Sequence, residues 1–229
     1  FAMQTGGAQL PMVALAEFPK EGFTWPYMLK LADLERVMGD RPRALMLADR
    51  AAKVPGADAV AVAFSKAAIL STMGKAKEAV ALLMSVKRDD NALAVLSGVA
   101  SIYVNAGDTA KFGETLQAMV PLTNAPTWLV TVSKSVQAQL AGKIAQAKQD
   151  SDAAIKAGAD ADYVFRSALV LDLMTTDQVS AEKHADAALK INSADSFANY
   201  VKAMIMTQRK KYQEAEHFYQ ISISQNPVW

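Results

Sequence analysis

The sequence has 229 residues, of which 52% are hydrophobic and 21% charged, a composition typical of an ordinary globular protein rather than a disordered or fibrous one. Its 24 basic and 23 acidic residues leave a net charge of +1, which argues against a nucleic acid or an anionic membrane as partner. The absence of cysteine excludes disulfides, thiolate catalysis and cysteine metal ligands, and it leaves the compartment open between cytoplasm and periplasm.

The first 24 residues precede the clear helical pattern of the chain. We predict that residues 1–24 are the remnant of a preceding repeat or an N-terminal helix, with Gly6 and Gly7 at its turn. Because the chain starts at Phe1 rather than at a methionine, and Trp229 stands where the first helix of a following unit would begin, we expect a longer parent protein. The longest charge-free stretch with helical character, residues 91–107, is shorter than the roughly 20 residues that a bilayer requires, so we predict no membrane insertion.

From residue 25 onward, turn-like positions recur at spacings of 35, 33, 35, 34 and 34 residues. Mostly small residues stand at two fixed distances from each turn, which is expected where helices cross too closely for large side chains. The turn positions are Gly39, Gly74, Gly107, Gly142, Thr176 and Lys210. The column seven residues before each turn holds Ala32, Ala67, Ala100, Ser135, Leu169 and Ala203. The column five residues after each turn holds Ala44, Ala79, Phe112, Ala147, Ala181 and Ala215.

Each repeated unit has the pattern of two amphipathic helices joined by a tight turn. Apolar residues recur three and four apart, as at Ala76, Ala79, Val80 and Leu83, and strand patterns are absent from the sequence. We therefore predict an all-α fold in which residues 25–229 form about six helix-turn-helix repeats. The predicted units are residues 25–59, 60–92, 93–127, 128–161, 162–195 and 196–229.

The residue patterns contain no catalytic, cofactor-binding or metal-binding motif. His217 stands between Glu214, Glu216 and two aromatic residues, and we interpret it as a solvated helix position beside Phe218. His184 lies 33 residues earlier, at a nearly equivalent outer position of the preceding unit. Neither histidine has a second histidine four residues along its helix, and no phosphate-binding or nucleophile motif occurs. We predict that the chain is not an enzyme and takes no cofactor.

The repeat resembles the tetratricopeptide repeat, a 34-residue unit with small residues at its eighth and twentieth positions and a proline near its end. The last unit matches best, with Ala203, Ala215, Tyr219 and Pro227 in register and Tyr212 at the usual aromatic position. The resemblance implies a right-handed superhelical solenoid in which the first helix of each unit lines a concave face. It also implies that this face binds a peptide segment or a partner helix.

Three positions depart from the family pattern. Phe112 replaces a small residue in the third unit, Leu169 leaves the register of the fifth unit ambiguous by one residue, and residues 175–177 replace its glycine turn. We expect local bends of the stack at these places.

The resemblance assigns groove positions to the fifth and ninth residues of each unit, apart from the fifth unit, whose register is ambiguous. The Lys, Arg and Asn side chains with which some family members grip a terminal carboxylate are missing from this set, which argues against such a clamp. The fifth positions are Leu29, Phe64, Ser97, Val132 and Tyr200, and the ninth positions are Asp33, Ala68, Ser101, Val136 and Met204.

Six apolar residues form the predicted partner-binding groove, because aromatic rings and methionine suit adaptable apolar contacts. They are Phe64, Val132, Val136, Phe197, Tyr200 and Met204. The alternative interpretation is that these residues form the core between neighbouring units, and for any single residue it is the favoured one.

Two functional hypotheses follow from the repeat and from the resemblance. The leading hypothesis is a non-enzymatic scaffold that binds a protein or peptide of unknown identity in its concave groove. The alternative is an accessory repeat domain of a larger bacterial enzyme, or of an envelope or polysaccharide export assembly. A solenoid without polar capping helices is also expected to self-associate end to end.

Overall fold

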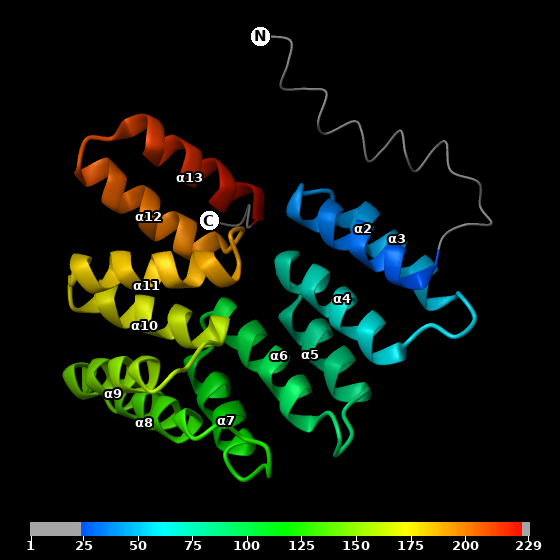
Figure 1. Ribbon diagram of the computed structural model, residues 1–229, viewed down its shortest axis with the longest axis horizontal. Coiled ribbons are helices and arrows are strands. Elements are labelled where there is room, and N and C mark those ends of the chain that lie inside the picture. Colours follow the sequence, from blue (N-terminus) through cyan, green and yellow to red (C-terminus); the bar gives the residue numbers. More distant parts are fainter. Residues whose placement is uncertain (1–23, 226–229) are drawn as a thin grey trace.

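The computed structural model describes residues 24–225, and twelve α-helices and no strand lie in that range. The all-α prediction is confirmed (Figure 1). The helices are α2 (Trp25–Val37), α3 (Arg41–Ala52), α4 (Ala59–Thr72), α5 (Ala76–Ser85), α6 (Ala92–Asn105), α7 (Thr109–Met119), α8 (Trp128–Leu140), α9 (Ile144–Lys156), α10 (Asp162–Met174), α11 (Gln178–Ile191), α12 (Ser196–Gln208) and α13 (Tyr212–Gln225).

Consecutive helices pack as six antiparallel pairs, from α2 with α3 to α12 with α13. The pairs begin at residues 25, 59, 92, 128, 162 and 196, against predicted unit starts of 25, 60, 93, 128, 162 and 196. The predicted remnant at residues 1–24 lies, apart from Thr24, outside the described residues. No helix within residues 24–225 combines the length and the apolar character that a membrane crossing needs.

The first helix of every pair ends in the same way. The residue at the predicted turn position has a positive φ, and the next backbone N–H donates to a carbonyl five residues back, at 2.8–3.0 Å, which satisfies an otherwise unpaired helix-end carbonyl. Four turns use glycine, whereas Thr176 and Lys210 adopt φ values of 54° and 59° despite carrying side chains. The repeat phase read across these two positions is therefore confirmed.

Both columns of mostly small residues lie in the core. All twelve side chains are at most 3% exposed. In the fourth pair the two columns are joined directly, because the Ser135 hydroxyl donates to the Ala147 carbonyl at 2.6 Å. The small columns therefore mark the close helix crossings that their pattern predicted.

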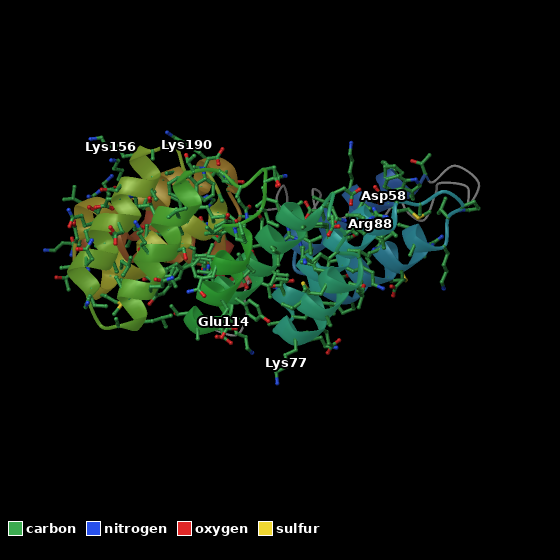
Figure 2. All side chains as sticks on the ribbon, turned by 90° about the horizontal axis from the view of Figure 1, so that it is seen from below. Asp58, Lys77, Arg88, Glu114, Lys156 and Lys190 are labelled. Carbon is green, nitrogen blue, oxygen red and sulfur yellow. The ribbon has the colours of Figure 1, made fainter. Side chains whose placement is uncertain are left out.

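The first helices form an inner row, and the second helices form an outer layer. α4 packs on α2 and α6, and α12 packs on α10, whereas each second helix from α3 to α11 packs on the first helices before and after it. Figure 2 shows Lys156, Lys190 and Asp58, all close to connections between pairs, toward one edge of the molecule. Lys77, beside the α4–α5 turn, lies at the opposite edge.

The inner row is interrupted at the fourth pair. α10 packs directly on α6, whereas α8 packs mainly on α7 and α9 (Figure 1). The large Phe112 ring, which stands where other pairs have a small residue, is 1% exposed and meets the Tyr163 ring of α10 edge to face at 6.0 Å. One of the sequence departures therefore lies at the place where the regular stack breaks.

The last helix returns to the first pair, so the row of pairs closes on itself (Figure 1). Arg41 Nη2 donates to the Ser224 carbonyl at 2.7 Å, and Gln225 Nε2 donates to the Val37 carbonyl. Part of each end surface is thus covered within a single chain. Self-association through the ends stays a prediction.

Candidate functional site

Two of the predicted groove residues belong to the core. Val132 and Val136 are 2% and 0% exposed and pack in one cluster with residues of α6, α7, α9 and α10. The physical reason is the displacement of α8 from the inner row, which turns its fifth and ninth positions toward other helices. We therefore leave both valines out of the contact surface proposed below.

The three predicted contact residues of α12 point to different neighbours. Phe197 is only 7% exposed, and its ring lies 4.6 Å from the Arg166 guanidinium carbon and stacks on Tyr200 at 6.5 Å. Tyr200 is half-buried and meets Tyr219 of α13 edge to face at 6.1 Å. Met204 borders a separate hollow of about 150 Å³ against the ends of α10 and α11. Phe197 and Tyr200 therefore contact each other, whereas Met204 borders a different hollow of the same helix.

Phe64 lines a larger pocket between α4, α6 and the start of α10, and we call it the junction pocket. Its volume is about 350 Å³. The ring lies against Gly98 of α6, where an added Cβ would come within 3.0 Å of Phe64 Cε1, so the glycine makes this close approach possible. The side chains that give the pocket its chemistry are the aromatic Phe64, Trp128 and Tyr163, the hydroxyls of Ser97 and Ser101, and the carboxylates of Asp160 and Asp162.

Three polar contacts hold α10 on α6 beside this pocket. The Ser101 hydroxyl donates to Asp162 Oδ1 at 2.9 Å, the Tyr163 hydroxyl has Ser97 as its hydrogen-bond partner, and Arg166 Nε donates weakly to the Val104 carbonyl at 3.4 Å. Ser97 and Ser101 are predicted groove positions, and part of that groove is thus occupied by a helix of the same chain.

Burial shifts the pKa values of these groups in the direction that opposes their charged forms. It raises the pKa of Asp162, although the bond from Ser101 opposes the change, and it raises the pKa of Tyr163 to about 12. Burial likewise lowers the pKa of Arg166. The junction therefore contains one carboxyl and one guanidinium whose charge is disfavoured by their surroundings.

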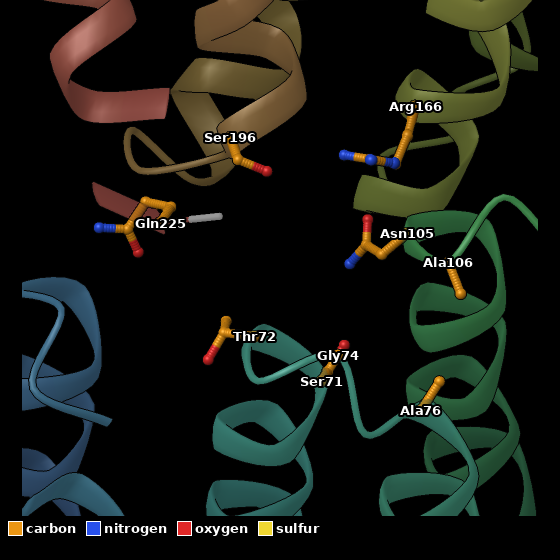
Figure 3. Close-up of a pocket in the computed structure, with 9 residues that line it drawn as sticks. All are labelled: Ser71, Thr72, Gly74, Ala76, Asn105, Ala106, Arg166, Ser196 and Gln225. Atoms are coloured by element: carbon orange, nitrogen blue, oxygen red, sulfur yellow. The ribbon is translucent and has the colours of Figure 1, made fainter. Parts of the chain in front are cut away.

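A second cavity, the central cavity, lies where four helix pairs meet. It has a volume of about 300 Å³, and Figure 3 shows the Arg166 guanidinium at its border with the Asn105 side chain below it. Its polar lining comes from Ser71, Thr72, Asn105, Arg166, Ser196 and Gln225.

Arg166 is the inner-face residue that the sequence analysis missed. With the turn fixed at Thr176, Arg166 occupies the fifth position of the fifth unit, which had been left out because its register was ambiguous. The signal was an arginine inside the apolar segment DYVFRSALVLDLM. Its side chain is 7% exposed, and its ion pair with Asp195 spans 4.0 Å.

A buried polar network joins the outer helices of the fourth and fifth pairs. His184 is 4% exposed, and its Nδ1 lies 2.7 Å from Oδ2 of Asp172, while Oδ1 of the same carboxylate accepts from Lys148. His184 lies on the outer helix α11, as predicted, but its expected near-equivalence with His217 is wrong, because Asp172 of α10 gives its ring a buried partner. His217 is exposed and lies beside Phe218, with ring centroids 5.8 Å apart, as predicted.

The network is a cross-link between α9, α10 and α11. Burial lowers the pKa of Lys148, but the bond to Asp172 and the charges of Asp172, Asp152 and Asp177 outweigh it and raise the pKa above its ordinary value. Among residues 24–225, no three histidine or acidic side chains are arranged to hold a metal ion. The arrangement supports a structural role.

Comparisons with known proteins bear on the fold. No protein-family model and no curated protein matches the sequence. Among solved structures, the chain is similar to a tetratricopeptide repeat protein from Parabacteroides merdae, with 10% identity and a TM-score of 0.53 over 94% of this chain and 89% of that chain. A second structure, the TPR2AB domain of yeast Sti1 in complex with pHSP90, has 14% identity and a TM-score of 0.34 over 86% of this chain and 91% of that chain, and it supports no conclusion about this chain. The first likeness confirms the predicted resemblance at the level of the fold: the chain is a helical-repeat solenoid of the tetratricopeptide type.

Proposed function

We propose that the chain is a scaffold that binds an extended protein segment along its inner face, with a lysine or arginine side chain of that segment in the junction pocket. The observation that carries the proposal is the combination of aromatic walls and carboxylates in one pocket of about 350 Å³. Cations are attracted both to aromatic faces and to carboxylates, so this lining suits a basic side chain.

The charges around the pocket support this choice. Asp160 is exposed, and no ion pair joins it to another residue of the described chain. Asp162 already accepts from Ser101 and from the Tyr163 backbone N–H, so Asp160 is the carboxylate available to a partner. A second hollow of about 520 Å³, between α2 and α4, extends the first-helix face for the rest of the segment.

The solenoid contributes rigidity to binding. Its inner helices are fixed by close crossings, so little conformational entropy is lost on this side when an extended partner binds. The absence of enzyme activity and the accessory-domain hypothesis stay predictions, since no observation on the described residues favours or opposes them.

Selection from a display library of extended random peptides tests the proposal. We expect enriched peptides to share a lysine or arginine and to lose affinity when it is replaced by leucine. Asp160→Lys should weaken these peptides at least as much as Phe64→Ala does, because it places a like charge beside the basic side chain.

Glu114→Lys is the matched control, because it makes the same change of charge on exposed Glu114 of the outer helix α7 (Figure 2). Its peptide affinities should equal those of the parent in a fluorescence anisotropy titration. Enriched peptides without a basic residue, or equal losses in Asp160→Lys and Glu114→Lys, would contradict the proposal, as would the absence of any enrichment.

A further inference from the structure

The central cavity has one fully charged group in its described lining. Helix ends of both signs surround it: α5 and α12 begin there at Ala76 and Ser196, while α4 and α6 end there at Thr72 and Asn105. The opposed helix dipoles roughly offset each other. The positive charge of the Arg166 guanidinium therefore makes the cavity favour an anionic ligand group.

The hydrogen-bonding capacity of Arg166 is largely unused within the described chain. The guanidinium makes the 3.4 Å bond from Nε to the Val104 carbonyl, approaches Asp195 with Nη1 at 4.0 Å, and lies over the face of the Phe197 ring. Among residues 24–225, no hydrogen bond involves Nη1 or Nη2, although the side chain is only 7% exposed. Burial removes hydration from the guanidinium, and its few contacts with neighbouring residues offset only part of that free-energy cost.

Asp195 does not satisfy the guanidinium. Its Oδ1 caps α12 by accepting from the Ala198 backbone N–H at 2.7 Å, and its distance from Nη1 exceeds that of a hydrogen bond. Asp162, the other nearby carboxyl, is bonded to Ser101 and Tyr163. Neither carboxyl makes the paired, two-point contact that guanidinium groups form with oxyanions.

We propose that the central cavity binds the oxyanion of a small molecule, a carboxylate or a phosphate group, through Nη1 and Nη2 of Arg166. The Ser71, Thr72 and Ser196 hydroxyls and the Asn105 amide offer hydrogen bonds to the remainder of the ligand. A volume of about 300 Å³ matches the lower end of the range for small-molecule sites. The site lies outside the junction pocket and does not depend on the proposed peptide binding.

The ligand would also join distant parts of the chain. Gln225 borders the cavity, and its Nε2 holds α13 to the carbonyl of Val37 in the first pair. Asn105 belongs to α6 and Arg166 to α10, the two helices of the interrupted inner row. A bound ligand would thus connect the α6–α10 junction with the contact between α13 and the first helix pair.

Isothermal titration calorimetry with sodium phosphate and with sodium acetate tests the proposal, against sodium chloride at equal ionic strength. We expect at least one of the two oxyanions to bind the parent. Arg166→Met should weaken this binding by about tenfold or more, because the charged donor is lost.

Asn105→Asp is the sharper variant. Asn105 is exposed, its side chain makes no hydrogen bond or ion pair with residues 24–225, and Figure 3 shows its amide next to the Arg166 side chain. The new carboxylate should pair with Arg166 and compete with added oxyanions, so binding falls while the melting temperature is kept or rises. Weaker binding with an unchanged or higher melting temperature would show that the site is lost while the fold is kept. Arg166→Met alone does not separate these two outcomes.

Arg88→Met is the control, because Arg88 is an exposed arginine remote from the cavity, and its variant should bind like the parent. Phosphate binding without acetate binding would identify a phosphate ligand, and acetate binding without phosphate binding would identify a carboxylate. The proposal is overturned if neither oxyanion binds the parent more than chloride does, if Asn105→Asp binds like the parent, or if Arg88→Met loses as much as Arg166→Met.

Discussion

The regular helix pairs and the α6–α10 junction are held together by different kinds of contact. Within the regular pairs, small buried residues such as Ala67 and Ala79 allow close crossings, and apolar side chains make most of the core contacts. At the junction, α10 meets α6 through serine, aspartate, tyrosine and arginine side chains. The repeated helix crossings thus determine the overall stack of pairs, which we call the frame. A few polar contacts between residues distant in sequence determine the junction pocket and the central cavity.

The largest loss of stability is expected for a substitution of Phe112, which belongs both to a regular pair and to the α6–α10 junction. Phe112 stands in a column of small residues yet packs beneath Tyr163, so Phe112→Ala should lower the free energy of unfolding by about 3–5 kcal/mol in urea denaturation. Val179→Ala, at a side chain that is 82% exposed, should change it little. A loss at Phe112 as small as that at Val179 would show that the ring is not part of the junction core.

A smaller effect is expected from a larger side chain in the regular frame. Ala67→Leu should cost about 1–3 kcal/mol, because Ala67 is 1% exposed and its neighbours leave no space. The adjacent Ala68→Leu is the matched control on the exposed side of the same helix and should be nearly neutral in thermal unfolding. Equal melting temperatures for the two variants would mean that the crossing is looser than its pattern indicates.

The smallest effect concerns the pH dependence of stability at the junction. The pKa of Asp162 is raised in the folded chain, so Asp162 destabilises the fold as the pH rises from its ordinary pKa of 3.8 through the raised value. Asp162→Asn keeps an oxygen for Ser101 and should remove this fall. Urea midpoints measured across the acidic range should therefore decline less with rising pH in the variant, and parallel profiles would contradict the assignment.

The frame could be predicted because its signals are local. Each first helix ends at a left-handed residue that the sequence marks with glycine, or with Thr176 and Lys210 in the same phase. The small columns report helix crossings within one pair, such as the bond from Ser135 to Ala147. Such signals lie within a few residues of the structure that they specify.

The candidate sites could be predicted only in part, because they depend on contacts between distant residues. Phe64 was expected on the inner face and lines the junction pocket, but Val132 and Val136 are core residues since α8 leaves the inner row. Ser101 and Asp162 are 61 residues apart, and no local sequence pattern predicted their contact. Arg166 and the partners of His184 were missed for the same reason.

The central claim is that α10, and not α8, lies beside α6 on the inner face. The chain has no cysteine, so paired cysteine substitutions provide the only thiols in a disulfide cross-linking experiment. Under mild oxidation, Ser101→Cys with Asp162→Cys should cross-link within a monomer, whereas Ser101→Cys with Val132→Cys, the pair that an uninterrupted stack would favour, should not. Cross-linking of the second pair without the first would contradict the account.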